Sequence, residues 1–139
     1  MKGGGLNLAL GHGVDLFNHG YFWEAHEAWE EPWQVERRDS PHRLYLQGLI
    51  RLAAAALKFR TQQPAGVMAH AGWCAEVFDR LYKQHPGIAD VGGGPEPLEL
   101  AALAGRLSQD SEAWDVTWNG PNPCLETVLV MSRFGPSIL

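Results

Sequence analysis

The segment from Phe22 to Trp33 is rich in groups able to do chemistry: three tryptophans, four glutamates and one histidine lie within twelve residues. At about 100° of rotation per residue, the segment is predicted to form an amphipathic helix. Its outward face holds Glu24, Glu27 and Glu31, and its apolar face holds Phe22, Trp29 and Trp33. His26 falls among these aromatic residues, and Glu30 follows one turn later at the edge of the same face.

His26 and Glu30 are four residues apart, so their side chains are neighbours on one helix face and can form a hydrogen bond. A carboxylate beside an imidazole favours the protonated ring and fixes its tautomer. This pairing suits catalysis, metal binding and plain architecture equally well. Because a buried histidine is usually satisfied by hydrogen bonds within the core, we predict a structural pair in an aromatic core.

Metal binding is the first alternative for this pair. His26-Glu27-x-x-Glu30 is superficially similar to the zinc-protease pattern, but a glutamate stands where the second histidine belongs. A zinc ion would need a third or fourth ligand from elsewhere in the chain. The candidates by residue type are His70, or His12 and His19. A metal-assisted hydrolase would use His26 and Glu30, helped by Glu27 or His70.

A small-ligand pocket is the second alternative. Its walls would be Trp29, Trp33 and Trp73, with His26 and Glu30 at its floor. Gln47 and Arg51 are expected on the next helix, across the contact with this pair. There they either supply polar partners to the pair or form a solvated stripe.

The elements that must position these residues are five predicted helices. Apolar periodicity places them at residues 8–18, 21–33, 41–62, 65–84 and 98–107. Ser40 and Pro41 have the types favoured at the N-cap and first position of a helix, and Gly20 suits a helix stop. Pro32 predicts a kink or an end. The expected fold is an all-α bundle of two antiparallel hairpins plus a further helix.

The chain is expected to form a single domain, residues 1–139, with a helical core at about 14–107. Residues 1–5 include three glycines and are predicted to form a loose end. Residues 91–97, rich in glycine and proline, are a predicted loop. Residues 108–139 are expected to form an irregular C-terminal extension. Its apolar run, residues 125–131, would pack on the bundle or on a second copy.

Composition limits the possible partners. The net charge is −5 and only 19% of residues are charged, which argues against nucleic-acid binding. No stretch reaches the roughly 20 apolar residues of a membrane span, so no membrane role is expected. Cys74 and Cys124 lie fifty residues apart and are predicted to be reduced thiols of a cytoplasmic protein. Cys74 lies on an apolar helix face and should behave as a small buried hydrophobe.

Two blocks of the sequence resemble a known family. His26-x-x-x-Glu30-x-x-Trp33 matches the HxxxExxW motif of the domain of unknown function 309 family, found in bacteria and archaea. Residues 17–27 look like the family's entry to that motif, and residues 46–55 are similar to its second block. The resemblance covers about residues 14–107 and implies a small all-helical bundle. It implies no reaction, because the family has no assigned activity.

The sequence therefore favours a non-catalytic module that binds a small ligand or a protein partner. No cofactor is predicted, and no complete catalytic set is evident. The alternatives are the metal-assisted hydrolase and a helical protein–protein interaction module. The low charge and apolar tail are also consistent with a homo-oligomer.

Overall fold

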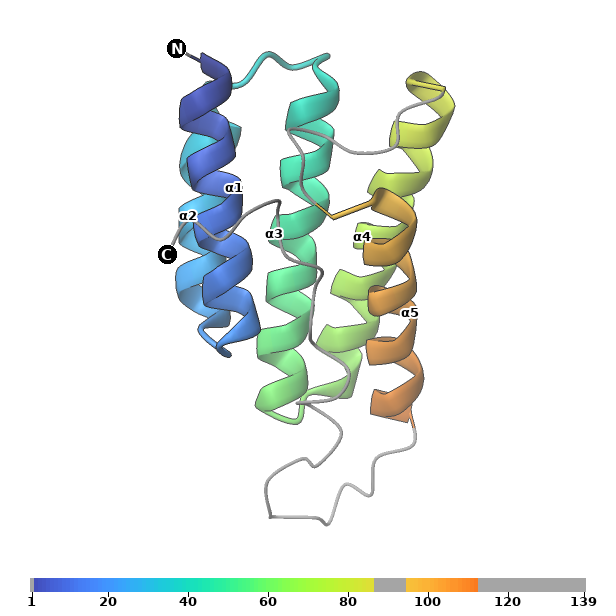
Figure 1. Cartoon of the computed structure of the whole chain (residues 1–139). Helices are drawn as coiled ribbons and strands as arrows, with labels where there is room; N and C mark the ends of the chain where they lie inside the picture. Colours follow the sequence, from blue (N-terminus) through green and yellow to red (C-terminus); the bar gives the residue numbers. More distant parts are fainter. Residues whose placement is uncertain (1, 87–94, 113–139) are drawn as a thin grey trace.

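A computed structural model describes residues 2–86 and 95–112 of the chain, with side chains for residues 8–86 and 95–111. Across these ranges it contains five α-helices and no β-strand. The helices are α1 (Lys2–Asn18), α2 (Phe22–Val35), α3 (Pro41–Arg60), α4 (Pro64–Gln84) and α5 (Pro97–Glu112), as Figure 1 shows. The predicted all-α bundle is confirmed.

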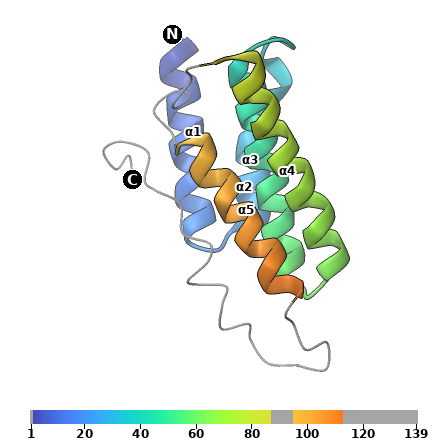
Figure 2. The same ribbon diagram turned by 90° about the vertical axis from the view of Figure 1, so that its right-hand side faces the viewer.

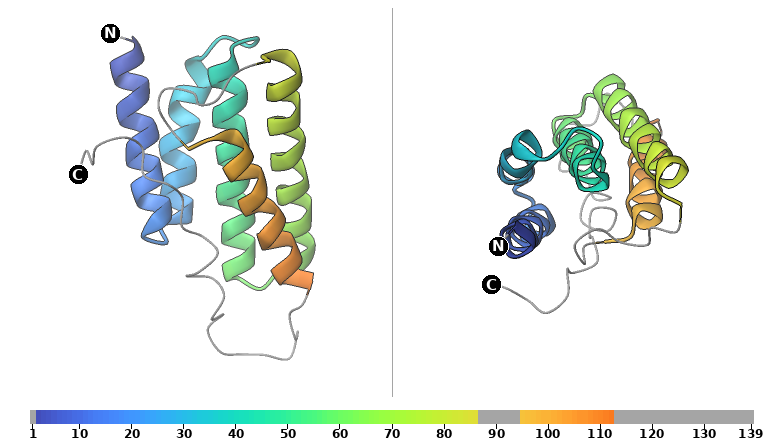
Figure 3. Two further views of the ribbon diagram at one scale, coloured as in Figure 1. Left: turned by 45° about the vertical axis from the view of Figure 1, so that its right-hand side comes forward. Right: turned by 90° about the horizontal axis from the view of Figure 1, so that it is seen from above.

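The middle of the bundle is α3, which packs between α2 and α4 (Figure 3). The outer helices complete the packing: α1 lies against α2, and α5 lies against α4 and α3. Figure 2 shows α4 and α5 side by side. Seen from above in Figure 3, α1 and α5 lie on the same side of the row formed by α2, α3 and α4. The other side of that row is not covered by any of the five helices.

The hydrophobic core fills the space between this row and the two outer helices. The largest share comes from α3, whose inward stripe includes Leu46, Leu49, Leu52, Ala53 and Ala56, all fully buried. These positions recur every three or four residues, as expected for one face of a helix packed against neighbours. The polar positions of α3 are thereby directed to the side that α1 and α5 leave open.

The contact between α1 and α2 depends on a glycine and a tryptophan. Trp29 is fully buried, and its indole Nε1 donates a hydrogen bond to the carbonyl of Leu10 at 3.4 Å. Gly13 lies directly under that ring, since a Cβ built at this position would be only 2.0 Å from Trp29 Nε1. The glycine is therefore a packing requirement, although it is a poor helix former.

The helix ends agree with most of the sequence signals. The Ser40 hydroxyl accepts a hydrogen bond from the backbone N–H of His42 at 3.0 Å, which confirms it as the N-cap of α3. Gly20 has φ of +86°, the left-handed conformation expected after α1. Pro32 lies inside α2, and the helix continues past it to Val35.

Two predicted boundaries are wrong. The first helix begins at Lys2, not at residue 8, and it includes the three glycines that were expected to form a loose end. Extending an existing helix costs only the propensity of each added residue, so these glycines do not prevent it. The fifth helix continues to Glu112, five residues past its last predicted residue. The apolar run 125–131, Cys124 and most of the predicted extension lie outside the described residues.

Candidate functional site

One face of α3 is polar and half-buried along its whole length. It is formed by Arg43, Gln47, Arg51, Ala54 and Lys58, which are all of intermediate exposure and lie opposite the core stripe. We call these five residues the α3 outer face. They are partly shielded because α2 and α4 flank them on either side. Because these residues lie opposite the buried stripe, they are on the side of the α2–α3–α4 row away from α1 and α5, whose arrangement Figure 3 shows.

The residues of the sequence motif line one side of this face. His26 Nε2 lies 3.4 Å from Glu30 Oε2, so the predicted pair is present. The two side chains are 23% and 41% exposed, which places them at the rim of the core and corrects the expectation of a pair inside it. The reason is geometric, because about 60° of rotation around α2 separates His26 from the fully buried Trp29. The exposed indole of Trp23 stacks on the His26 ring at 5.3 Å, nearly parallel at 13°.

Trp33, the last residue of the motif, packs under a cation. The Arg43 guanidinium lies 4.3 Å from the centre of the Trp33 ring. Arg43 Nη1 also donates hydrogen bonds to the carbonyls of Trp33 and Glu36, at 3.1 and 3.0 Å. These carbonyls belong to the end of α2, where backbone acceptors lack partners within the helix. Arg43 therefore joins the end of α2 to the start of α3.

On the opposite side, α4 contributes an imidazole and an exposed indole. The Arg51 guanidinium lies 4.7 Å from the centre of the Trp73 ring, so this cation bridges α3 and α4. His70 meets Trp73 edge-on, with ring centres 5.2 Å apart. Trp73 is 46% exposed. Arg51 thus contacts α4. Among the described residues it does not hydrogen-bond to His26 or Glu30, which was one of the two alternatives for this residue.

Three ring nitrogens around this face are buried without a hydrogen-bond partner among the described residues. They are His26 Nδ1, Trp33 Nε1 and His70 Nδ1. Two of them, on His26 and Trp33, belong to residues that the sequence singles out. A buried polar group left unpaired costs about 1–3 kcal/mol, so such groups in a folded protein call for an explanation.

Two groups of α4, the His70 imidazole and the Cys74 thiol, have pKa values that differ from their usual values. Burial lowers the pKa of His70 below 6.5, and the positive charges of Arg51, Lys58 and His26 lower it further. His70 is therefore neutral at pH 7. Burial raises the pKa of the Cys74 thiol to about 12, and the side chain is fully buried. The prediction that Cys74 is a buried hydrophobe is confirmed, since the nucleophilic thiolate is not formed at neutral pH.

The three tryptophans of the alternative pocket do not lie together. Trp29 faces α1 and is sealed against Gly13. Trp33 faces α3, and Trp73 belongs to α4 on the far side of the α3 outer face. Helical periodicity placed Trp29 and Trp33 on one face, but the 40° between them is enough to direct them to different neighbouring helices.

The remaining sequence candidates are dispersed. Glu27 is exposed, on the water side of α2 together with Glu24 and Glu31. His12 is also exposed, and the ring of His19 is hydrogen-bonded to the carbonyl of Asp15 at 2.7 Å. Within residues 2–86 and 95–112, no three His, Cys, Asp or Glu side chains are gathered in a way that could hold a metal ion.

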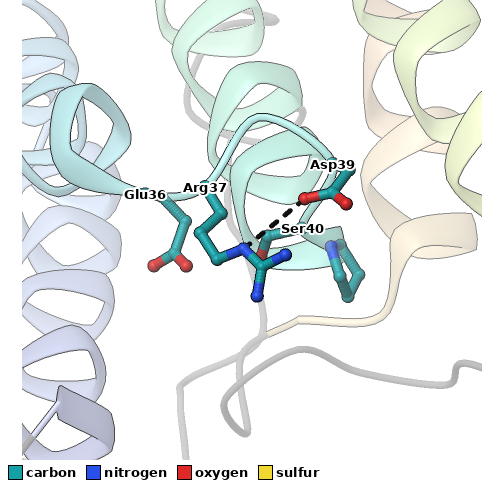
Figure 4. Close-up of a pocket in the computed structure, with 5 residues that line it drawn as sticks. Glu36, Arg37, Asp39 and Ser40 are labelled. Atoms are coloured by element: carbon teal, nitrogen blue, oxygen red, sulfur yellow. Dashed lines mark ion pairs between the residues drawn. The ribbon is translucent and has the colours of Figure 1, made fainter.

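An open surface pocket lies elsewhere, in the loop between α2 and α3 (Figure 4). It is lined by Glu36, Arg37, Asp39, Ser40 and Pro41. Its Arg37 and Asp39 form a solvent-exposed ion pair at 3.7 Å, drawn as the dashed line in Figure 4. The Ser40 hydroxyl is already engaged as the helix cap. Exposed ion pairs of this kind contribute little interaction energy. The pocket contains none of His26, Glu30 and Trp33.

A comparison with known protein families matches the part of the chain that contains the α3 outer face. Residues 10–69 match the model of a domain of unknown function, DUF309. This confirms the resemblance over a shorter range than expected. Both sequence blocks, at residues 17–27 and 46–55, lie inside the match. The DUF309 match includes α2, α3 and the whole α3 outer face, and ends just before His70. None of the curated proteins matches this chain.

In the part of the chain that the structure describes, no helix is both long and apolar enough to cross a bilayer.

The sequence interpretation missed the residues that complete this face. Arg43 and Lys58 were not considered as partners, although they are spaced with Gln47 and Arg51 at four, four and seven residues along one helix side. A second signal was also available: α3 carries four Lys or Arg residues and no carboxylate, whereas α2 carries four glutamates and no Lys or Arg. Because α3 has no carboxylate, its polar face is positively charged.

Proposed function

We propose that this protein is a non-catalytic ligand-binding helical module whose site is the α3 outer face with His26, Glu30 and Trp33 beside it. The observation that carries the proposal is the pair of unpartnered buried ring nitrogens in the motif, His26 Nδ1 and Trp33 Nε1. A hydrogen-bonding ligand that reaches either atom would remove the cost of leaving it unpaired.

The chemistry of the site favours binding over catalysis. His26 and Glu30 form a proton-transfer pair, but a covalent mechanism would also need a protein nucleophile within hydrogen-bond reach. The Cys74 thiol, inside the core, does not meet this requirement. A metal-assisted reaction would require further ligands beside His26 and Glu30, and the positive charge of Arg51 opposes a cation there.

The proposal is tested by nuclear magnetic resonance with four small probes: benzamide, benzoate, phenyl phosphate and benzylamine. We expect at least one probe to shift the Trp33 indole N–H in a saturable manner. The Trp29 indole N–H, bonded to Leu10 and buried against α1, is the internal reference and should not move. If no probe shifts Trp33, the proposal is wrong.

The variant Trp33→Phe separates binding from architecture. It keeps an aromatic ring under Arg43 but removes the unpaired N–H. We expect the unfolding free energy to stay within about 1 kcal/mol of wild type, since the lost ring area is offset by the removed unpaired donor. Affinity for the probe that binds should fall at least about fivefold, the equivalent of about 1 kcal/mol. Unchanged affinity would make the indole N–H irrelevant to ligand binding.

A further inference from the structure

His26 and His70 lie at the same level on either side of α3. Arg43 lies over Trp33 and Arg60 over Phe22, which fixes the antiparallel register of α2 and α3. His26, between Phe22 and Trp33, is thereby level with the middle of α3.

The register with α4 gives the same level. Lys58 packs on Gly66, where an added Cβ would be 2.9 Å from its side chain, and Arg51 lies over Trp73. In each pair the two residue numbers add to the same sum, so His70 is level with Ala54. The side chain at this level of α3 is the single methyl group of Ala54.

The charges around these imidazoles are positive along α3. Arg51 and Lys58 lie one turn to either side of Ala54, and α3 has no carboxylate. Both cations, together with His26, lower the pKa of His70, so they are close enough to act on it electrostatically. Glu30 is the acidic group on the α2 side, held at His26 Nε2. A metal ion would be repelled from this surrounding, whereas an anion would be attracted.

We propose that His26, His70, Arg51 and Lys58 bind the oxyanion of a small planar ligand, an aromatic phosphate or carboxylate. The proposal rests on the proposed function and names the ligand class of the same site. When its Nδ1 carries a proton, each imidazole can donate from this unpartnered atom to an oxyanion, and the guanidinium and ammonium groups supply charge. The planar part of the ligand is accommodated by the indoles of Trp23 and Trp73, 54% and 46% exposed, which lie beside the two imidazoles.

The test compares phenyl phosphate, benzoate, the neutral isostere benzamide and the cation benzylamine in calorimetric titrations of the full chain at low ionic strength. We expect phenyl phosphate or benzoate to bind at least about tenfold more tightly than benzamide, and the stronger of the two identifies the oxyanion. Equal or better binding of benzamide or benzylamine would overturn the anion assignment while leaving the proposed function standing. Failure of all four probes would remove both.

Substitutions of single residues test where the anion binds. Arg51→Gln should weaken binding of the preferred anion by about tenfold or more, as expected for loss of a charge-assisted hydrogen bond. Arg80→Gln removes the same charge from an exposed position on α4 and is the matched control, expected to change affinity by less than about twofold. Lys58→Gln provides a second reading if Arg51→Gln fails to fold. Equal effects of Arg51→Gln and Arg80→Gln would show a nonspecific charge effect and overturn the proposal.

Discussion

Two tryptophans of the same helix, Trp29 and Trp33, have opposite environments. Trp29 faces α1, is fully buried, and donates its N–H to the carbonyl of Leu10 over a glycine that leaves room for the ring. Trp33 faces α3, is half-buried under Arg43, and has a buried N–H with no partner among the described residues. One turn of helix separates a completed packing arrangement from an incomplete one.

The difference indicates that the two sides of α2 have different roles. On the α1 side the indole N–H of Trp29 is hydrogen-bonded and its ring packs closely on Gly13, as is typical of protein cores. On the α3 side, His26, Trp33 and His70 retain unused hydrogen-bonding capacity. Stability and ligand binding are therefore expected to respond to different substitutions in the same helix.

Truncating each tryptophan to alanine should give the largest difference in unfolding free energy between the two sides of α2. Trp29→Ala should lower the free energy of unfolding by about 3–5 kcal/mol, because it opens a cavity in the core. Trp33→Ala should cost only about 1–2 kcal/mol, from partial burial and the contact with Arg43. Chemical denaturation of the two variants measures both values. Equal losses would mean that the two sides of α2 do not differ in stability.

Gly13→Ala should produce the next largest effect, with a sign that depends on Trp29. The added Cβ would meet the buried indole at 2.0 Å, so we expect a net loss of about 2 kcal/mol despite the better helix propensity of alanine. In a Trp29→Ala background the same substitution should instead stabilise by up to about 1 kcal/mol.

Gly72→Ala is the matched control for this experiment. Its Cβ would have no atom within 4 Å, on the exposed side of α4. It should therefore show only the propensity gain, in either background. A stabilising Gly13→Ala in the wild-type chain would contradict the close packing of Trp29 on α1.

Local signals were sufficient to predict most of the fold. The Ser40 cap and the glycine stop at Gly20 depend on a few neighbouring residues and are present as predicted. The outward direction of Glu24, Glu27 and Glu31 follows from helical period alone. The start of α1 was not predictable in this way, because glycine propensity is a weak term once a helix has formed.

The candidate site was only half predictable. The sequence identified His26, Glu30 and Trp33, but periodicity gives the face of a helix and not the neighbour that this face meets. Trp29 was therefore grouped with Trp33, although they contact different helices. The position of His70 opposite His26 depends on the register of α3 with both neighbours, which arises from contacts such as Arg51 on Trp73.

The smallest predicted effect is a pH dependence on the α3 side of the molecule. The pKa of His70 is lower in the folded protein than its usual value of 6.5, because of burial and the charges of Arg51, Lys58 and His26. Below that value the unfolded chain binds a proton that folded His70 does not, so the unfolding free energy falls as the pH drops from about 6.5 toward the folded pKa. His70→Gln should make this acid-side decline shallower, whereas His12→Gln, at an exposed position of α1, should not. Urea denaturation at several pH values from neutral to acidic measures the slopes. An unchanged slope in His70→Gln would contradict a pKa of His70 that is lower in the folded chain than in the unfolded chain.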